Sequence, residues 1–122
     1  MTDFRPRRSA LYMPAANERA LEKAKTLPAD CIIFDLEDAV APDAKSSARG
    51  AACAAAGSGE YAGRELMIRC NGLDTQWGAA DLAAIAVSGA SAVVVPKVSS
   101  ISYVDDVSAQ LDAAGAPSTM TV

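Results

Sequence analysis

Histidine is absent from this 122-residue chain, and cysteine and aromatic residues are scarce. Without histidine, the chain offers no Cys/His zinc site and no histidine-based catalytic triad. The three cysteines, Cys31, Cys53 and Cys70, are widely spaced and form no Cys-x-x-Cys pair, so we expect free, buried thiols. Only 5% of the residues are aromatic and alanine is the most frequent residue, which favours close-packed helices over an all-β sandwich.

Long apolar runs and an excess of basic residues are also missing. No stretch approaches the roughly 20 apolar residues that span a bilayer, and the first residues lack the apolar core of a secretory signal. We therefore expect a cytoplasmic protein that does not bind membranes. The net charge of −4 argues against nucleic acid as a partner. The remaining expectation is a single globular domain over residues 1–122, in which 51% hydrophobic residues supply a core.

Short apolar runs alternate with helical segments along the chain. Strands are predicted at 9–13, 31–36, 66–69 and 92–95, with the start of a fifth at 120–122. Helices are predicted over 18–24, 42–56, 76–87 and 101–114, opened by Asn17, Pro42, Thr75 and Ser100. The nearly continuous apolar runs are typical of parallel strands that are covered on both faces. The pattern predicts four complete βα units in a parallel sheet.

Two α/β architectures fit this pattern. One is a small doubly wound sheet of five strands, and the other is the first half of a (β/α)8 barrel, also called a TIM barrel. Length favours the doubly wound sheet, because a complete barrel needs about 250 residues. Polar residues at the strand ends favour the barrel. In both folds the carboxyl ends of the strands line the ligand site.

Three carboxylates, Asp35, Glu37 and Asp38, lie at the carboxyl end of the strand predicted at 31–36. Grouping them at the end of a buried strand is costly unless a cation lies nearby. That cation could be a divalent ion that prefers oxygen ligands, or the side chains of Arg69 and Lys97. Alternatively, Asp35 and Asp38 accept hydrogen bonds from backbone amides at the turn into the next helix.

Cations follow the next two strands. Arg69 ends an apolar strand, where its planar guanidinium suits bidentate binding of a substrate carboxylate. The alternative is a structural salt bridge to Glu37 or Asp38. Lys97 could be an electrostatic stabiliser, a Schiff-base amine or an ion-pair partner.

Further cations lie on the first predicted helix. Arg19 and Lys23 could hold phosphates near the start of this helix, although a solvated helix face gives the same pattern.

Together, the motifs resemble the citrate lyase beta subunit family of the HpcH/HpaI aldolase superfamily, which also contains malyl-CoA and citramalyl-CoA lyases. The motifs, in chain order, are Arg8-Ser-x-Leu-x-x-Pro14; Asp35-Leu-Glu-Asp-Ala-Val40 with Pro42, Lys45, Ala48 and Arg49; Ile68-Arg-Cys-Asn71 with Trp77, Asp81 and Leu82; and Val95-Pro-Lys-Val98. They cover essentially the whole chain in the expected order.

The resemblance implies a (β/α)8 barrel that uses Mg²⁺ to cleave or form a carbon–carbon bond in a short 2-hydroxyacyl-CoA such as citryl-, malyl- or citramalyl-CoA. By position, Arg69 matches the catalytic arginine that binds the substrate carboxylate. Glu37 and Asp38 match catalytic acidic residues that orient the metal's ligands or waters. Tyr12, Arg19 and Lys23 fall where coenzyme A contacts occur, and Lys97 is a further candidate for substrate binding.

The resemblance also implies that residues 1–122 form the N-terminal half of the barrel, with about four βα units and the start of strand five. The family's two direct Mg²⁺ ligands are expected beyond Val122, so a polypeptide that ended there is expected to be inactive. Open sheet edges then favour a homo-oligomer. Two alternatives remain at this stage: a 2-oxo acid aldolase of the same superfamily that acts without CoA, and a non-catalytic doubly wound binding module.

Overall fold

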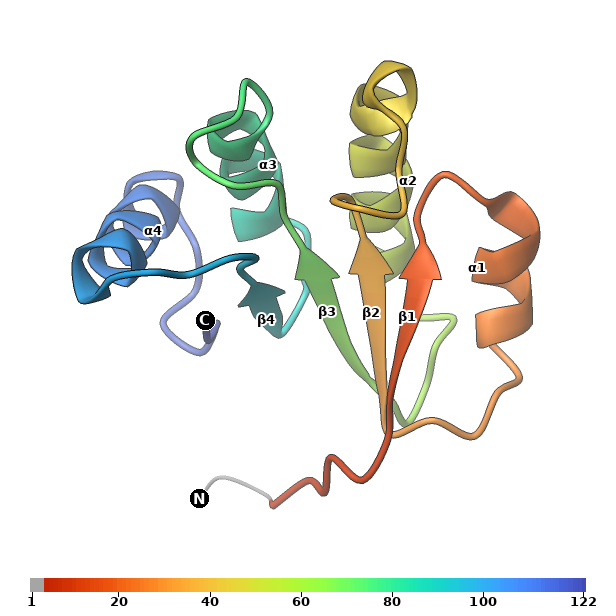
Figure 1. Ribbon diagram of the computed structural model, residues 1–122. Coiled ribbons are helices and arrows are strands. Elements are labelled where there is room, and N and C mark those ends of the chain that lie inside the picture. Colours follow the sequence, from red (N-terminus) through yellow and green to blue (C-terminus); the bar gives the residue numbers. More distant parts are fainter. Residues whose placement is uncertain (1–3) are drawn as a thin grey trace.

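The computed structural model describes residues 4–122, in which four strands alternate with helices (Figure 1). The elements are β1 (Ala10–Pro14), α1 (Glu18–Ala24), β2 (Cys31–Asp35), the 3₁₀ turn η1 (Pro42–Ala44), α2 (Lys45–Gly57), β3 (Glu65–Arg69), α3 (Gly78–Ala86), β4 (Ala92–Val94) and α4 (Ile101–Ala113). The alternation confirms the predicted βα units. Within residues 4–122, no helix has the length and apolar character needed to cross a membrane.

The four strands form one parallel sheet in the order β1-β2-β3-β4. A parallel bridge between Ala92 and Thr121 adds a fifth position beside β4, where the sequence predicts the start of another strand. A doubly wound sheet reverses its strand order at a switch point. Because the described strands follow one another without a reversal, the doubly wound alternative is excluded for this part of the chain.

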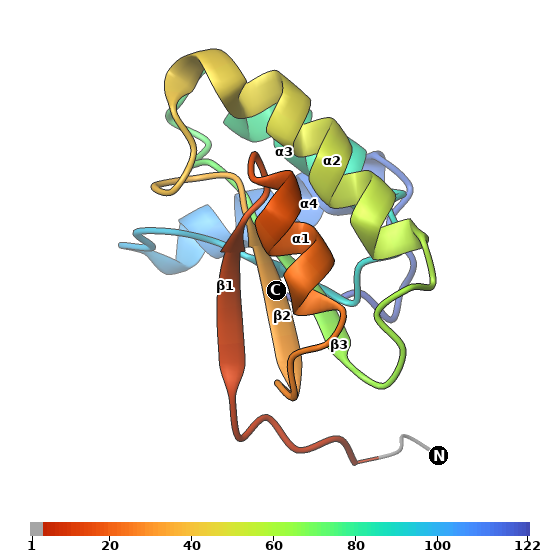
Figure 2. The same cartoon turned by 90° about the vertical axis from the view of Figure 1, so that its right-hand side faces the viewer.

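The two faces of the sheet differ in what covers them. One face carries Ile32, Phe34, Ile68 and Val93, which pack in one cluster with buried residues of all four helices. Figure 2 shows the helices stacked beside the sheet, with α1 and α2 in front of α3 and α4. The other face carries a smaller cluster, built from Cys31, Ile33, Met67 and Ala92. This second face, called the inner face below, bears the charged residues at its two ends.

The helix starts are partly as predicted. Asn17 caps α1 by accepting from the backbone N–H of Ala20 at 3.0 Å, and Ser100 caps α4 in the same way. The predicted start after Thr75 is wrong, because the Thr75 hydroxyl donates to the Gly72 carbonyl instead and α3 begins at Gly78. At Gly78 a Cβ atom would lie 2.2 Å from the Gly72 oxygen, so the chain approaches itself too closely for any other residue.

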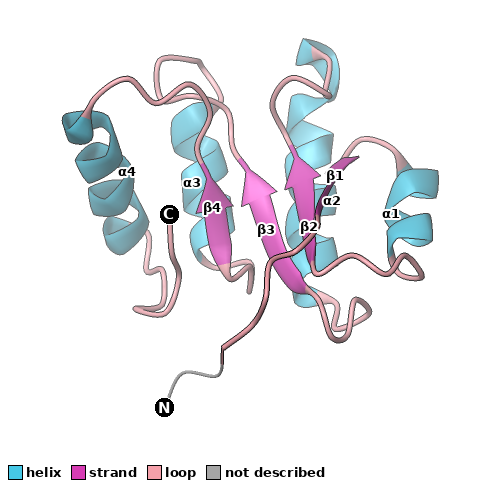
Figure 3. Cartoon of the chain, turned by 60° about the horizontal axis from the view of Figure 1, so that its bottom comes forward, coloured by secondary structure: helices cyan, strands magenta, loops and turns pink. Residues whose placement is uncertain are grey.

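The segment that leads into β1 crosses the amino ends of β2 and β3 (Figure 3). There Arg7 forms a bidentate ion pair with Glu65, at 2.7 and 2.8 Å. Glu65 and Cys31 are register partners on the inner face, and the Cys31 thiol lies 3.7 Å from a Glu65 oxygen. This ion pair ties the segment to the end of the sheet opposite the candidate site.

Candidate functional site

The centre of the candidate site is an ion pair between Asp35 and Arg69. The two residues are register partners at the carboxyl ends of β2 and β3, which places both side chains on the inner face. Arg69 binds both carboxylate oxygens of Asp35, through Nε at 2.7 Å and Nη2 at 2.8 Å. Asp35 is 1% exposed and also accepts from the backbone N–H groups of Glu37 and Ala39.

This pair corrects part of the sequence interpretation. The salt bridge from Arg69 to Glu37 that the sequence predicts is present, at 3.6 Å from Nη1, but the main partner of Arg69 is Asp35, which is not among the partners expected for it. The prediction that Asp35 binds backbone amides at the turn is confirmed. The same prediction for Asp38 is not met in the hydrogen bonds of the described residues, where Asp38 contacts Lys97 instead.

The charges of the central pair stabilise each other. Burial alone raises the pKa of Asp35, but hydrogen bonds from Arg69 and from two backbone amides outweigh it and hold this pKa below its ordinary value. The hydrogen bonds to Asp35 raise the pKa of Arg69 further above its already high value. Both groups therefore stay charged at neutral pH.

One edge of the Arg69 guanidinium remains available. Its Nε and Nη2 atoms are engaged by Asp35, and its plane lies 4.8 Å from the centre of the Tyr12 ring. Within residues 4–122 no hydrogen bond occupies Nη1, whose nearest carboxylate is that of Glu37. The side chain is 22% exposed, so a rigidly held arginine presents, at the carboxyl end of the sheet, an edge that makes no hydrogen bond among the described residues and only a 3.6 Å ion pair with Glu37.

Lys97 closes the site from β4. Its ammonium contacts the carboxylate of Glu37 and lies 3.4 Å from Asp38, and these partners raise its pKa, Glu37 most strongly. Lys97 takes a left-handed backbone conformation, with φ at 53°, where the chain turns after β4. A cavity of about 390 Å³ lies beside it, lined by Glu37, Tyr103 and neighbouring loop residues. The structure thus places Arg69, Glu37, Asp38, Lys97 and Tyr12 together.

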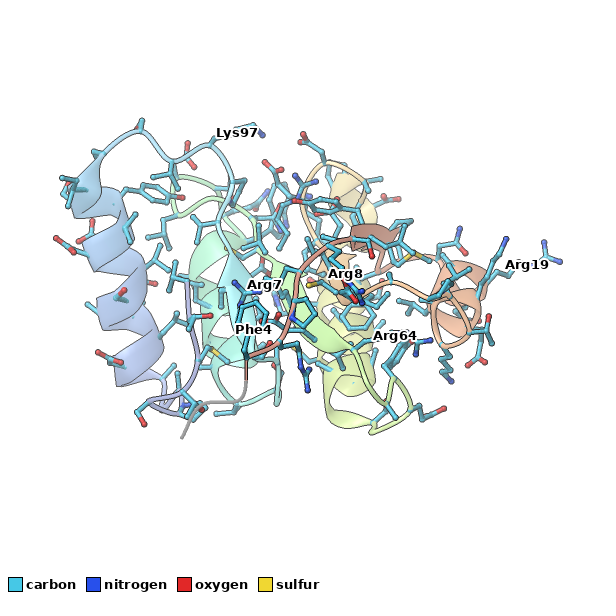
Figure 4. The ribbon with its side chains drawn as sticks, turned by 90° about the horizontal axis from the view of Figure 1, so that it is seen from below. Phe4, Arg7, Arg8, Arg19, Arg64 and Lys97 are labelled. Carbon is cyan, nitrogen blue, oxygen red and sulfur yellow. The ribbon has the colours of Figure 1, made fainter. Side chains whose placement is uncertain are left out.

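Arg19 and Lys23 do not join this cluster. Both lie on the exposed face of α1, and Figure 4 shows Arg19 pointing outward, well away from Lys97. A shallow cavity near the start of α1 is lined by Asn17, Arg19 and Ala39. The arrangement is compatible with a solvated helix face as well as with a phosphate site.

Two buried polar groups on the helix side support the strand ends. Asp81 is fully buried and accepts from Arg49 at 2.8 Å and from the backbone and side chain of Asn71. Lys45 is 6% exposed and donates to two backbone carbonyls of the acidic turn. In the sequence Lys45 and Arg49 stand out only as members of the motif that follows Asp35. Their spacing of four residues, on the same helix as the buried Ala48, is the signal that places both on the inward face.

The described residues do not build a complete metal centre. In residues 4–122 no group of three or more histidine, cysteine, aspartate or glutamate side chains is arranged to hold a metal ion. Asp35 is saturated by Arg69 and the backbone, and Glu37 and Asp38 already share Lys97. Glu37 and Asp38 by themselves therefore do not form a full ligand set.

The chain is thus a parallel α/β protein with fixed cations and carboxylates at the carboxyl ends of its strands, the edge where proteins of this class hold their ligands. The family of HpcH/HpaI aldolases and citrate lyases matches residues 8–116. The chain therefore belongs to the HpcH/HpaI aldolase/citrate lyase family.

Individual relatives agree with this assignment. A (3S)-malyl-CoA thioesterase of Cereibacter sphaeroides is 50% identical over 104 residues, which cover 85% of this chain and 36% of the relative. The citrate lyase subunit beta of Escherichia coli is 37% identical over 88% of this chain and 35% of its own length. The structure of CitE from Mycobacterium tuberculosis, in complex with magnesium, acetoacetate and coenzyme A, superimposes with a TM-score of 0.64 at 32% identity, over 80% of this chain and 35% of that one. The chain thus spans about a third of the length of these relatives.

Proposed function

We propose that this chain is the N-terminal half of a (β/α)8 barrel that cleaves or forms a carbon–carbon bond in a short 2-hydroxyacyl-CoA, with malyl-CoA as the first candidate. Family membership and the consecutive strand order support the barrel, and the relative named for (3S)-malyl-CoA supports the substrate. The intact mass of the natural protein tests the half-barrel. A complete barrel of about 250 residues predicts roughly 30 kDa, whereas 12.5 kDa would contradict it.

The observation that carries the proposal is the free edge of Arg69. Asp35 holds Nε and Nη2 of the guanidinium, whereas among the described residues Nη1 has only the longer ion pair with Glu37, at 3.6 Å. Malyl-CoA has a carboxylate next to its hydroxyl-bearing carbon, and the free edge suits this group. In cleavage, the hydroxyl loses its proton, the bond to the CH₂ group breaks and glyoxylate leaves; the acetyl-CoA enolate then takes up a proton. A fixed carboxylate orients that bond.

We propose magnesium as the cofactor, because the similar CitE structure contains it. When bound, it would stabilise the negative charge that develops during bond cleavage. Glu37 and Asp38 would help to orient it, and in this proposal its direct ligands lie outside residues 4–122. Removal of magnesium by EDTA is expected to abolish turnover.

Coenzyme A recognition is proposed for the exposed cations of α1. Lys23 and Arg19 are placed to meet phosphates, while Tyr12 contacts Arg69 and so serves the carboxylate end of the site. An aldolase that uses free 2-oxo acids would not need Lys23 or Arg19. A homo-oligomer in the cytoplasm remains our prediction for the assembled protein.

A second activity is favoured by the relative at 50% identity, whose name is that of a thioesterase. In thioester hydrolysis water attacks the thioester carbonyl and the C–S bond breaks, which gives malate and free CoA. Both reactions use the same substrate and the same carboxylate contact, so Arg69 serves either one.

The carboxylate contact is tested by comparing (3S)-malyl-CoA with 3-hydroxybutyryl-CoA, in which a methyl group replaces the carboxylate. We expect turnover of malyl-CoA only. Arg69→Lys keeps the charge but loses the planar fork, so we expect kcat/KM for malyl-CoA to fall by about 10- to 100-fold, the value of a charge-assisted hydrogen bond of roughly 1.5–3 kcal/mol. Equal turnover of both thioesters, or an unchanged kcat/KM in Arg69→Lys, would refute the role of Arg69.

A further inference from the structure

Lys45 is a buried charge that the proposed chemistry does not use. It begins α2 on the helix side of the sheet and is 6% exposed. Within the described residues it has no carboxylate partner, whereas six other basic residues form nine ion pairs. An unpaired buried ammonium is costly unless its N–H groups are satisfied by other acceptors.

Its acceptors are two consecutive backbone carbonyls of the acidic turn. The Lys45 ammonium donates to the carbonyl of Leu36 at 2.9 Å and to that of Glu37 at 2.8 Å. The Trp77 ring lies on another side of the ammonium, 5.1 Å from its centre to Nζ, where the π-face attracts the cation. A methionine would fill similar space without needing any of these contacts.

The same turn is held from the opposite side by Asp35. The Asp35 carboxylate accepts from the backbone N–H groups of Glu37 at 2.9 Å and of Ala39 at 3.1 Å. The Leu36–Glu37 peptide group is therefore fixed on both sides, its N–H by Asp35 and its C=O by Lys45, and the Glu37–Asp38 peptide group is fixed through its C=O by Lys45. This arrangement sets the position from which the Glu37 side chain reaches Arg69 and Lys97.

We propose that Lys45 is a positioning residue, whose buried ammonium locks the backbone of the Asp35–Asp38 turn and thereby holds the Glu37 side chain between Arg69 and Lys97. Lys45 does not touch the substrate. Its effect on turnover rests on the proposed function, whereas its effect on the turn does not. Loss of the ammonium frees two carbonyls, so the turn moves and Glu37 no longer keeps its place beside Arg69.

The test compares Lys45→Met, Lys45→Gln and the control Lys25→Met in the complete protein. Lys25 is a lysine with two ion pairs, to Glu22 and Glu60, and caps the C-terminal end of α1, where none of its hydrogen bonds or ion pairs reaches the acidic turn. The first readout is hydrogen exchange of the peptide that contains residues 35–40, which is independent of activity. The second is kcat and KM for malyl-CoA, and the third is the emission of Trp77, identified by subtracting the Trp77→Phe spectrum.

In Lys45→Met we expect exchange of the 35–40 peptide to accelerate at least tenfold, with other peptides unchanged, together with a shift in Trp77 emission and a fall of kcat of about tenfold. Lys45→Gln, which has no charge but can still donate hydrogen bonds through its NH₂ group, should lie in between, and it replaces Lys45→Met if the latter does not fold. Lys25→Met should resemble the wild type. Unchanged exchange at 35–40 would overturn the proposal, as would faster exchange with an unchanged kcat. A wild-type protein without any turnover would instead refute the proposed function, while the exchange result would still decide whether Lys45 fixes the turn.

Discussion

Replacing Arg69 with methionine should destabilise the fold as well as remove the proposed substrate contact. The substitution leaves Asp35, 1% exposed, with only the N–H groups of Glu37 and Ala39 as partners. Breaking a buried ion pair costs about 3–5 kcal/mol. Because Arg69 is 22% exposed and two hydrogen bonds to Asp35 survive, we expect a loss near the lower limit, about 3 kcal/mol in the free energy of unfolding at pH 7.

The loss should depend on pH in a defined direction. In the wild type the pKa of Asp35 lies below 3.8, so its stabilisation is present above that pH and is lost as the pH falls through the native pKa. In Arg69→Met burial dominates and the native pKa of Asp35 rises above the unfolded value. The penalty on its ionised form then applies at pH 7 and disappears as the pH falls. The difference between variant and wild type should therefore shrink from pH 7 to pH 4.

Urea denaturation at pH 7, 5.5 and 4 measures this difference, since urea does not screen charges. Arg64→Met is the matched control, because Arg64 is also half-buried but donates to the backbone carbonyl of Leu27 at 2.8 Å. We expect the control to lose about 1 kcal/mol, the value of one hydrogen bond, at all three pH values. A loss below 1 kcal/mol in Arg69→Met, or a loss that does not change with pH, would refute the account of the Asp35–Arg69 pair.

Three further predictions use other parts of the fold. Gly78→Ala should destabilise the protein by about 2 kcal/mol in thermal or urea unfolding, because its Cβ would meet the Gly72 carbonyl. Gly50→Ala in α2 is the control: its Cβ has free space, so it should stabilise the protein by up to about 1 kcal/mol, and equal effects of the two substitutions would contradict the close approach. Burial raises the pKa of Cys70 to about 12, so Cys70 should resist iodoacetamide at pH 8 until the protein unfolds. Peptide mass spectrometry measures the labelling, and rapid labelling of the native protein would contradict the burial of Cys70. Lys23→Ala should raise KM for malyl-CoA several-fold and leave KM for a free 2-oxo acid unchanged; equal KM values for malyl-CoA in the two proteins would argue against a CoA contact on α1.

The sequence predicts the order and type of the elements well, because apolar runs and helix caps are local signals. The strands at 31–35 and 65–69 and the caps at Asn17 and Ser100 lie within a residue of their predicted positions or match them. The start of α3 is missed because it depends on a contact between Gly72 and Gly78 across a loop. Capping propensity at Thr75 carries no information about that approach.

For the site, the sequence identifies the charged residues but not how they pair. Arg69 has three acidic candidates within four residues, and only the strand register places Asp35 opposite it. Lys45 and Trp77 meet across two helices that are far apart in the sequence, so no spacing predicts their contact. Arg19 and Lys23 show the converse case, because a helix periodicity places them on one face without showing what that face contacts.

The most direct test of the central claim is the identity of the products formed from (3S)-malyl-CoA by the complete protein with magnesium, measured by mass spectrometry. We predict glyoxylate and acetyl-CoA in equal amounts, formed by cleavage of the carbon–carbon bond. Malate and free CoA would contradict carbon–carbon cleavage and assign the same site to thioester hydrolysis, and an unchanged thioester would contradict both activities.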